Sequence, residues 1–106
     1  MGICEGRTVI ITGAGGGLGR AYALAFAAEG GTACASPAEL AARCEVVVSV
    51  VVDAAQTEAV LFGEHGAAAA MRPGSLFVMC STVDPNWSVA LEARLAERGL
   101  LYLDAP

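Results

Sequence analysis

Short aliphatic runs alternate along the chain with segments that carry helix-capping residues. These runs predict five β-strands, at Val9 to Thr12, Thr32 to Ala35, Val46 to Val52, Leu76 to Cys80 and Leu100 to Leu103. Four of them are rich in aliphatic residues without apolar and polar alternation, which indicates strands covered on both faces. The remaining run, "TACA" at Thr32 to Ala35, is short and weak in strand propensity, so we expect it at an edge of the sheet.

Three predicted helices begin directly after predicted strands. "SPAE" at Ser36 to Glu39 combines a capping-box Ser and Glu with a proline at the first helical position. "DAAQ" at Asp53 to Gln56 and "DPNW" at Asp84 to Trp87 place an acidic cap at the helix start. Gly99 is expected to end the last helix. Two further segments, the break "MRPG" at Met71 to Gly74 and the helix-forming "AAAA" at Ala67 to Ala70, precede the fourth strand.

This alternation of strands and helices predicts one α/β domain over residues 1–106, a length typical of a single domain. With right-handed crossovers, the elements form a three-layer Rossmann-like sandwich around a five-stranded parallel sheet. We expect the strand order 2-1-3-4-5, because the first crossover runs one way and the others run the opposite way. The switch point then lies beside the first strand, where open sheets bind ligands.

A string of glycines, Thr12 to Gly19, follows the first predicted strand and opens a predicted helix. A phosphate site at a helix N-terminus needs a tight turn, close backbone approach to the pyrophosphate and close packing of helix on strand. Gly13, Gly17 and Gly19 supply these three properties. The alternative is a glycine-rich turn that only allows close packing of strand and helix.

Over Gly6 to Gly30 the segment "GRTVIITGAGGGLGRAYALAFAAEG" fits TGxxxG[LI]G and resembles the opening β-α unit of short-chain dehydrogenases/reductases. The resemblance implies that NAD or NADP binds at the N-terminus of this helix. The residues implied are Gly13, Gly15, Gly17, Leu18 and Gly19. In that family the next strand ends in a residue that selects between the two cofactors. Here Ser36 stands at that position instead of Asp or Arg, so binding is expected to be weak.

From Ala35 to Pro106 the chain resembles a different family, the 3-hydroxyisobutyrate dehydrogenase type of β-hydroxyacid dehydrogenases. The motifs that carry the resemblance are "SPAE", "PGSLFVMCSTVDP" and the closing "LDAP". It corresponds to the second part of that family's nucleotide-binding domain. The resemblance implies that Val51, Val52, Gln56 and Thr82 line the cofactor. The alternatives are strand core for the two valines and turn chemistry for Thr82.

The two resemblances meet near residues 30–34, where a second strand and helix of the hydroxyacid dehydrogenase pattern are missing. Two origins stay open: an engineered or recombined fusion of two dinucleotide-binding halves, and a natural fragment with a deletion.

Neither family's catalytic group is encoded, because the chain contains no lysine and stops before the substrate loop that follows "DAP". We therefore expect no catalytic residue, and His65, the single histidine, is expected on the surface. Three hypotheses follow. The chain is an NAD(P)-binding domain that is inactive alone, an oxidoreductase completed by a partner, or a structural α/β module without a ligand.

Composition excludes further classes of binding partner and location. Six basic and eleven acidic residues give a net charge of −5, which opposes nucleic-acid binding. No apolar run approaches the ~20 residues needed to cross a bilayer, and no secretory signal is evident. The four cysteines lack CxxC spacing, so we expect no metal site and a reducing, cytoplasmic location. Assembly into a homo-oligomer stays open.

Overall fold

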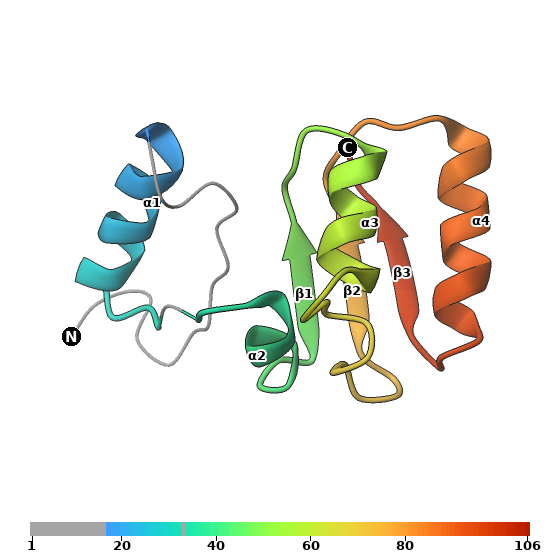
Figure 1. The fold of residues 1–106 in the computed structure, drawn as a ribbon, viewed down its shortest axis with the longest axis horizontal. Helices are drawn as coiled ribbons and strands as arrows, with labels where there is room; N and C mark the ends of the chain where they lie inside the picture. The colour runs from blue at the N-terminus through green and yellow to red at the C-terminus, as the bar shows by residue number, and fades with distance from the viewer. Residues whose placement is uncertain (1–16, 33) are drawn as a thin grey trace.

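The computed structural model describes residues 17–32 and 34–106. The described elements are α1 (Gly17–Ala28), α2 (Pro37–Ala41), β1 (Val46–Ser49), α3 (Ala54–Phe62), β2 (Leu76–Met79), α4 (Pro85–Ala96) and β3 (Leu101–Asp104), as Figure 1 shows. The strand predicted at Val9 to Thr12 lies outside the described residues, as do Gly13 and Gly15.

The three described strands form a parallel sheet in the order β1-β2-β3. Val46 pairs with Leu76 and Leu76 with Leu101, and the register continues to Ser49, Met79 and Asp104. These strands correspond to the third, fourth and fifth predicted strands, and their neighbours are the expected ones. The helices between them, α3 and α4, lie on the same side of the sheet (Figure 1). The described part of the fold is thus a parallel α/β arrangement.

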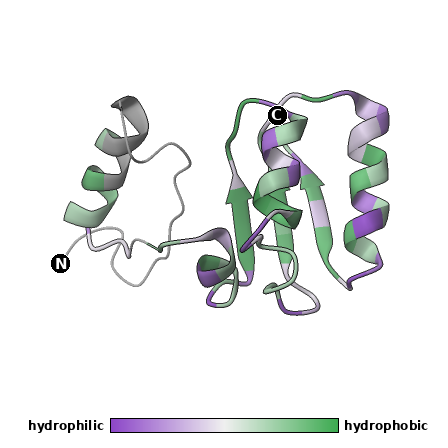
Figure 2. Ribbon diagram, viewed as in Figure 1, coloured by the Kyte–Doolittle hydropathy of each residue, from purple (hydrophilic) through white to green (hydrophobic). Residues whose placement is uncertain are grey.

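One face of the sheet carries the hydrophobic core. Val47, Phe77 and Met79 point from the strands into a cluster that includes Leu61 of α3 and Leu91 of α4. Further members of the cluster come from α2 and from the loop before β2: Leu40, Ala41, Ala67, Ala68 and Met71. Figure 2 shows the apolar strands beside helices of mixed hydropathy, as expected for helices with one face in water.

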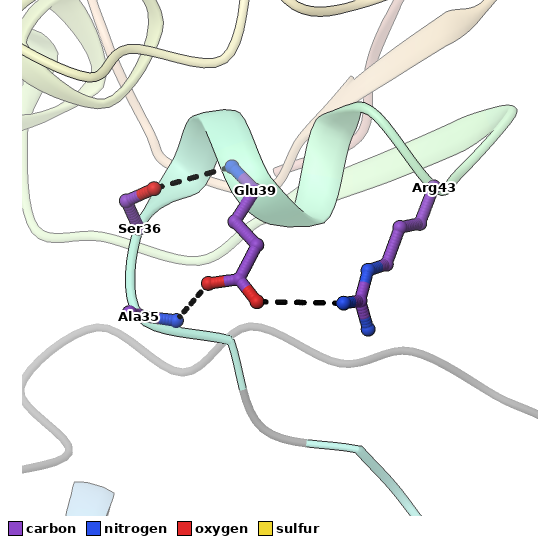
Figure 3. Close-up of polar contacts among 4 residues, drawn as sticks. All are labelled: Ala35, Ser36, Glu39 and Arg43. Atoms are coloured by element: carbon purple, nitrogen blue, oxygen red, sulfur yellow. Dashed lines mark hydrogen bonds and ion pairs between the residues drawn. The ribbon is translucent and has the colours of Figure 1, made fainter.

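The predicted helix caps are confirmed. At α2, the Ser36 hydroxyl accepts a hydrogen bond from the Glu39 backbone N–H at 3.1 Å, and the Glu39 carboxylate accepts one from the Ala35 N–H at 2.8 Å (Figure 3). The same carboxylate lies 3.5 Å from the guanidinium of Arg43. Asp53 caps α3 through the Gln56 N–H, and Asp84 caps α4 through the N–H groups of Asn86 and Trp87.

Two glycines close the turns that lead into β2 and β3. Gly99 has φ +73, and the hydrogen bonds Gly99 N–H to Ala96 and Leu100 N–H to Leu95 give the paired bonds of a Schellman motif. Gly74 has φ +89 in the turn before β2. Both positions lie in the left-handed region, which glycine adopts without steric cost.

Some expected elements differ in the structure. The edge strand predicted at Thr32 to Ala35 is wrong for its described residues, because Thr32 makes an isolated β-bridge and Ala35 lies in a bend before α2. Small residues there offer little side-chain surface to hold a strand. β1 ends at Ser49 rather than Val52, since the chain turns toward the cap of α3. The segment Ala67–Ala70 forms turns rather than a helix, because Gly63 and Gly66 break the chain before it.

The expectation that both sheet faces are covered is also wrong for the described residues. Opposite the core, the register groups six aliphatic side chains on one face: Val46, Val48, Leu76, Val78, Leu101 and Leu103. We call this set the open face. Val48 is 46% exposed and Leu103 is 50% exposed, whereas Leu76 and Val78 in the central strand are half-buried. α1 stands apart from the sheet (Figure 1), so within residues 17–32 and 34–106 this face has no covering helix.

Candidate functional site

The segments that follow β1 and β2 lie together at the carboxyl edge of the sheet. The ladder continues past the strands, since the Cys80 N–H donates to the Ser49 carbonyl at 2.9 Å. The chain then enters α3 after the first loop and α4 after the second, so both loops stay at this edge. Open parallel sheets bind ligands at this location.

Ser81 fastens the two loops to one another. Its hydroxyl donates to the Val51 carbonyl at 2.6 Å and accepts from the Val51 N–H at 3.3 Å. Ser81 is buried, so these bonds are shielded from water and fix the Val51 backbone. Sequence reasoning quoted the "STVDP" turn but did not single out Ser81. A small hydroxyl residue directly after a buried strand was the available signal.

Gln56 holds the loop that follows β1. Its backbone N–H donates to the Asp53 carboxylate at 2.9 Å, and its side-chain oxygen accepts from the Val52 N–H at 3.0 Å. The loop between β1 and α3 is therefore held from both ends. Of the nine predicted cofactor residues, the structure brings Val51, Val52 and Gln56 into one loop and places Thr82 directly after Ser81 in the neighbouring loop.

The surface of this edge is apolar and exposed. Val50 is 69% exposed and Val52 is 78% exposed, and Thr82 beside Ser81 is exposed as well. Valine side chains in water are unfavourable unless something covers them, and a flat ring such as nicotinamide or adenine offers a matching apolar surface. The residues present at this edge therefore fit one half of a dinucleotide.

Three of the predicted cofactor residues lie at the start of α1. Gly17, Leu18 and Gly19 form its first turn, which is followed by two more turns of helix. A helix of this length has N–H groups at its start that suit a phosphate. The structure shows α1 apart from the three strands, so it does not bring these residues together with Val51 and Thr82 (Figure 1).

A polar cluster that sequence reasoning missed lies where β3 meets α4. The Ser88 hydroxyl donates to the Asp104 carboxylate at 2.9 Å and lies 2.7 Å from the Tyr102 hydroxyl. Burial raises the pKa of the Tyr102 phenol, and the Asp104 charge acts in the same direction, so the phenol stays a neutral donor. The signal was the spacing of Tyr102 and Asp104, two residues apart in a strand and hence on one face. The cluster anchors β3 to α4.

His65 lies at the other end of the sheet. It is in the exposed loop after α3, with φ +56, and its carbonyl accepts a hydrogen bond from the Ala38 N–H. The side chain is 72% exposed and borders a shallow hollow of about 330 Å³ shared with Phe62 and Arg98. The surface position expected for His65 is confirmed. Among the described residues, no three potential metal ligands gather at one place.

Comparison with known proteins decides the family. The family described as the NAD binding domain of 6-phosphogluconate dehydrogenase matches residues 18–106. The chain belongs to this family. An L-threonate dehydrogenase of Cupriavidus necator is 63% identical over 81 residues, which cover 76% of this chain and 27% of that protein. The chain thus spans about a quarter of this relative's length. It is an NAD-binding domain of the hydroxyacid dehydrogenase type, as the resemblance over Ala35 to Pro106 predicted.

Solved structures agree with this assignment. A 3-hydroxyisobutyrate dehydrogenase of Salmonella typhimurium covers 74% of the chain with a TM-score of 0.67 and 36% identity, and the match takes up 27% of that structure. A putative oxidoreductase of Mycobacterium avium covers 95% of the chain with a TM-score of 0.77 and 27% identity, over 33% of that structure. The Rossmann-like fold is therefore confirmed. None of the helices in the described residues has the length and apolar character to cross a membrane.

Proposed function

We propose that this domain binds NAD or NADP across the carboxyl edge of its sheet and does not catalyse a reaction by itself. Gly13, Gly15, Gly17, Leu18 and Gly19 hold the pyrophosphate at the start of α1. Val51, Val52, Gln56 and Thr82 line the other half of the cofactor. When bound, the dinucleotide supplies hydride transfer, and the substrate groups come from polypeptide outside these residues.

The observation that carries the proposal is the fastened pair of loops at the carboxyl edge. Ser81 and Gln56 fix the backbone of Val51 and Val52, so the apolar surface exists before a ligand arrives. A preorganised surface costs little conformational entropy on binding. Affinity is nevertheless expected to be weak, because an acidic ribose anchor is missing and a lost hydrogen bond of this kind costs ~1–3 kcal/mol.

We also propose that the sheet continues in the predicted order 1-3-4-5, with Val9 to Thr12 paired to β1. The observed neighbours β1, β2 and β3 support the last three positions of this order. The glycine string Thr12 to Gly19 supports an opening unit of the short-chain dehydrogenase type joined near residues 30–34. Fusion and natural deletion both produce this arrangement.

A calorimetric titration with NAD⁺ and NADH tests the binding. We expect a saturable signal in the native chain and its loss in Gly17→Val, because a branched side chain at the helix start blocks the approach of the pyrophosphate. Glu64→Gln, a change at an exposed side chain next to His65 and away from the carboxyl edge, is a control that should bind like the native chain. Equal signals for the native chain and Gly17→Val would overturn the proposal.

A second candidate is a dehydrogenase completed by a partner, either a further polypeptide or another copy in a homo-oligomer. It is favoured by the absence of lysine from the sequence and by the quarter-length match to the L-threonate dehydrogenase. A cytoplasmic location belongs to both candidates and rests on the cysteine pattern. Turnover of a hydroxyacid by the purified chain alone would exclude an inactive domain and a different polypeptide as the partner, and would leave a homo-oligomer as the complete enzyme.

A further inference from the structure

We propose that a hollow at the amino edge of the sheet, where the strands begin, binds a small organic carboxylate with an apolar body. The hollow has a volume of about 330 Å³, at the lower end of the range for small-molecule sites. α2, the end of α3, the loop after α3 and the turn after α4 all contribute to it (Figure 1). This edge is opposite to the carboxyl edge, so the inference is independent of the proposed cofactor site.

The wall of the hollow is mainly apolar. Five of the side chains that line it contain only carbon: Ala38, Leu61, Phe62, Ala69 and Ala70. Ala69 is exposed, and Phe62 and Ala70 are half-buried, so part of this wall meets water. Apolar surface in a concave site gains free energy when an apolar group covers it. A ligand with an aliphatic or aromatic body therefore suits the wall.

Arg98 supplies the hollow with a positive charge. Its guanidinium lies 5.3 Å from the centre of the Phe62 ring, and Arg94 lies over the same ring at 4.1 Å. Arg94 is already joined to Glu58 by two hydrogen bonds. Among the arginines whose side chains the structure describes, Arg98 alone has neither an ion pair nor a hydrogen bond from its guanidinium. Its donors are therefore open to a carboxylate, which a guanidinium binds through two parallel bonds.

His65 adds a second polar group to the hollow. Its carbonyl accepts a hydrogen bond from the Ala38 N–H at 3.0 Å, which fixes the turn against α2. The imidazole can donate a hydrogen bond to a carboxylate. The Glu64 carboxylate lies 3.6 Å from the His65 ring nitrogen, but it is 91% exposed, so water and salt screen its repulsion of an anion.

Charge selects a ligand with a single negative charge. One guanidinium is open at the hollow, and the chain as a whole carries a net charge of −5, which repels multiply charged anions such as phosphate. A monocarboxylate balances the charge of Arg98 and leaves its apolar body for the wall around Phe62. Benzoate has both properties and is the probe for the test.

Titration of the native chain with benzoate, followed by NMR of the backbone amides, tests the site. We expect saturable shifts at Phe62, His65, Ala70 and Arg98, with a dissociation constant on the order of 1 mM because the hollow is shallow. Benzyl alcohol has a similar shape without the charge, and it should bind about fivefold more weakly or worse.

Two arginine variants separate a built site from general attraction to positive charge. Arg98→Met keeps an apolar side chain beside Phe62 and removes the charge, so benzoate should bind about fivefold more weakly or worse while benzyl alcohol is unaffected. Arg43→Met carries the same change at an exposed arginine outside the hollow and should bind benzoate like the native chain. Thermal unfolding confirms that each variant is folded.

Three results would overturn the proposal: no saturable shifts around the hollow at tens of millimolar benzoate, equal affinities for benzoate and benzyl alcohol, or unchanged benzoate binding in Arg98→Met. Equal losses in Arg98→Met and Arg43→Met would mark unspecific attraction of benzoate to exposed arginines and would overturn it as well.

Discussion

Two buried serines at the carboxyl edge have opposite surroundings. Ser81 has both hydrogen-bonding capacities used by Val51, whereas the Ser49 hydroxyl has no partner within the described part of the chain. Both side chains are about 3% exposed, so burial does not distinguish them. The free energy of a buried hydroxyl depends on whether its bonds are made.

We expect Ser81→Ala to lower the free energy of unfolding by about 1–2 kcal/mol, because the polar groups of Val51 lose their buried partner. Ser49→Ala should leave stability unchanged or raise it, since it removes an unsatisfied hydroxyl. Urea denaturation of the two variants measures both. A loss in Ser49→Ala equal to that in Ser81→Ala would show that Ser49 has a partner after all.

The ion pair between Glu58 and Arg94 predicts a pH dependence. Two bonds of 2.7 and 2.8 Å join the groups, and the hydrogen bonds from Arg94 lower the pKa of Glu58. Because the folded-state pKa is lowered, the stabilisation is present above the ordinary pKa of Glu and is lost as the pH falls through the folded-state value. Both side chains are over 40% exposed, which limits the effect to about 0.5 kcal/mol.

Glu58→Gln should therefore be less stable than the native chain near neutral pH by this small amount, and the difference should disappear in strong acid. Thermal unfolding at several pH values gives the comparison. A difference that grows on acidification would contradict the assigned pKa direction.

At the scale of elements, capping residues were read from the sequence more reliably than strands. Ser36, Asp53 and Asp84 each accept the expected backbone N–H, because a cap depends on residues within one turn. The length of β1 and the covering of the sheet faces depend on contacts between residues that are far apart in the sequence. Local pattern therefore placed the helix starts, but it overextended β1 to Val52 and predicted a strand at Thr32 to Ala35.

The cap of α4 can be tested through Trp87, the single tryptophan, which lies in the first turn of that helix. Asp84→Ala should cost about 1 kcal/mol of stability, whereas Asp84→Asn should retain most of it. Denaturation followed by tryptophan fluorescence measures both variants. Equal losses would mean that charge, rather than the cap bonds to Asn86 and Trp87, provides the stabilisation.

For the site, the sequence named four residues that the structure places at one edge, and it missed Ser81 and the cluster of Ser88, Tyr102 and Asp104. The four could be named because a resemblance to a family carries information on distant contacts. The missed residues act through hydrogen bonds between segments about 14 to 30 residues apart. Spacing within a single segment does not encode such pairs.

At the scale of the molecule, the proposed function gives this domain a cofactor site and no catalytic lysine. We expect no oxidation of hydroxyacids by the isolated chain at high protein concentration, because positioned acid-base groups contribute ~100 to 10,000-fold each. NADH absorbance with a panel of hydroxyacids measures this. Turnover that His65→Ala abolishes would contradict the account and make His65 a catalytic base.

The central claim is that a dinucleotide binds at the carboxyl edge, and an NMR titration of backbone amides with NAD⁺ tests it most directly. The account predicts saturable shifts at Val51, Val52, Gln56 and Thr82 and at the start of α1, with the loop around His65 unchanged. The absence of shifts at the carboxyl edge up to millimolar NAD⁺, or shifts confined to the hollow beside His65 and Arg98, would contradict it.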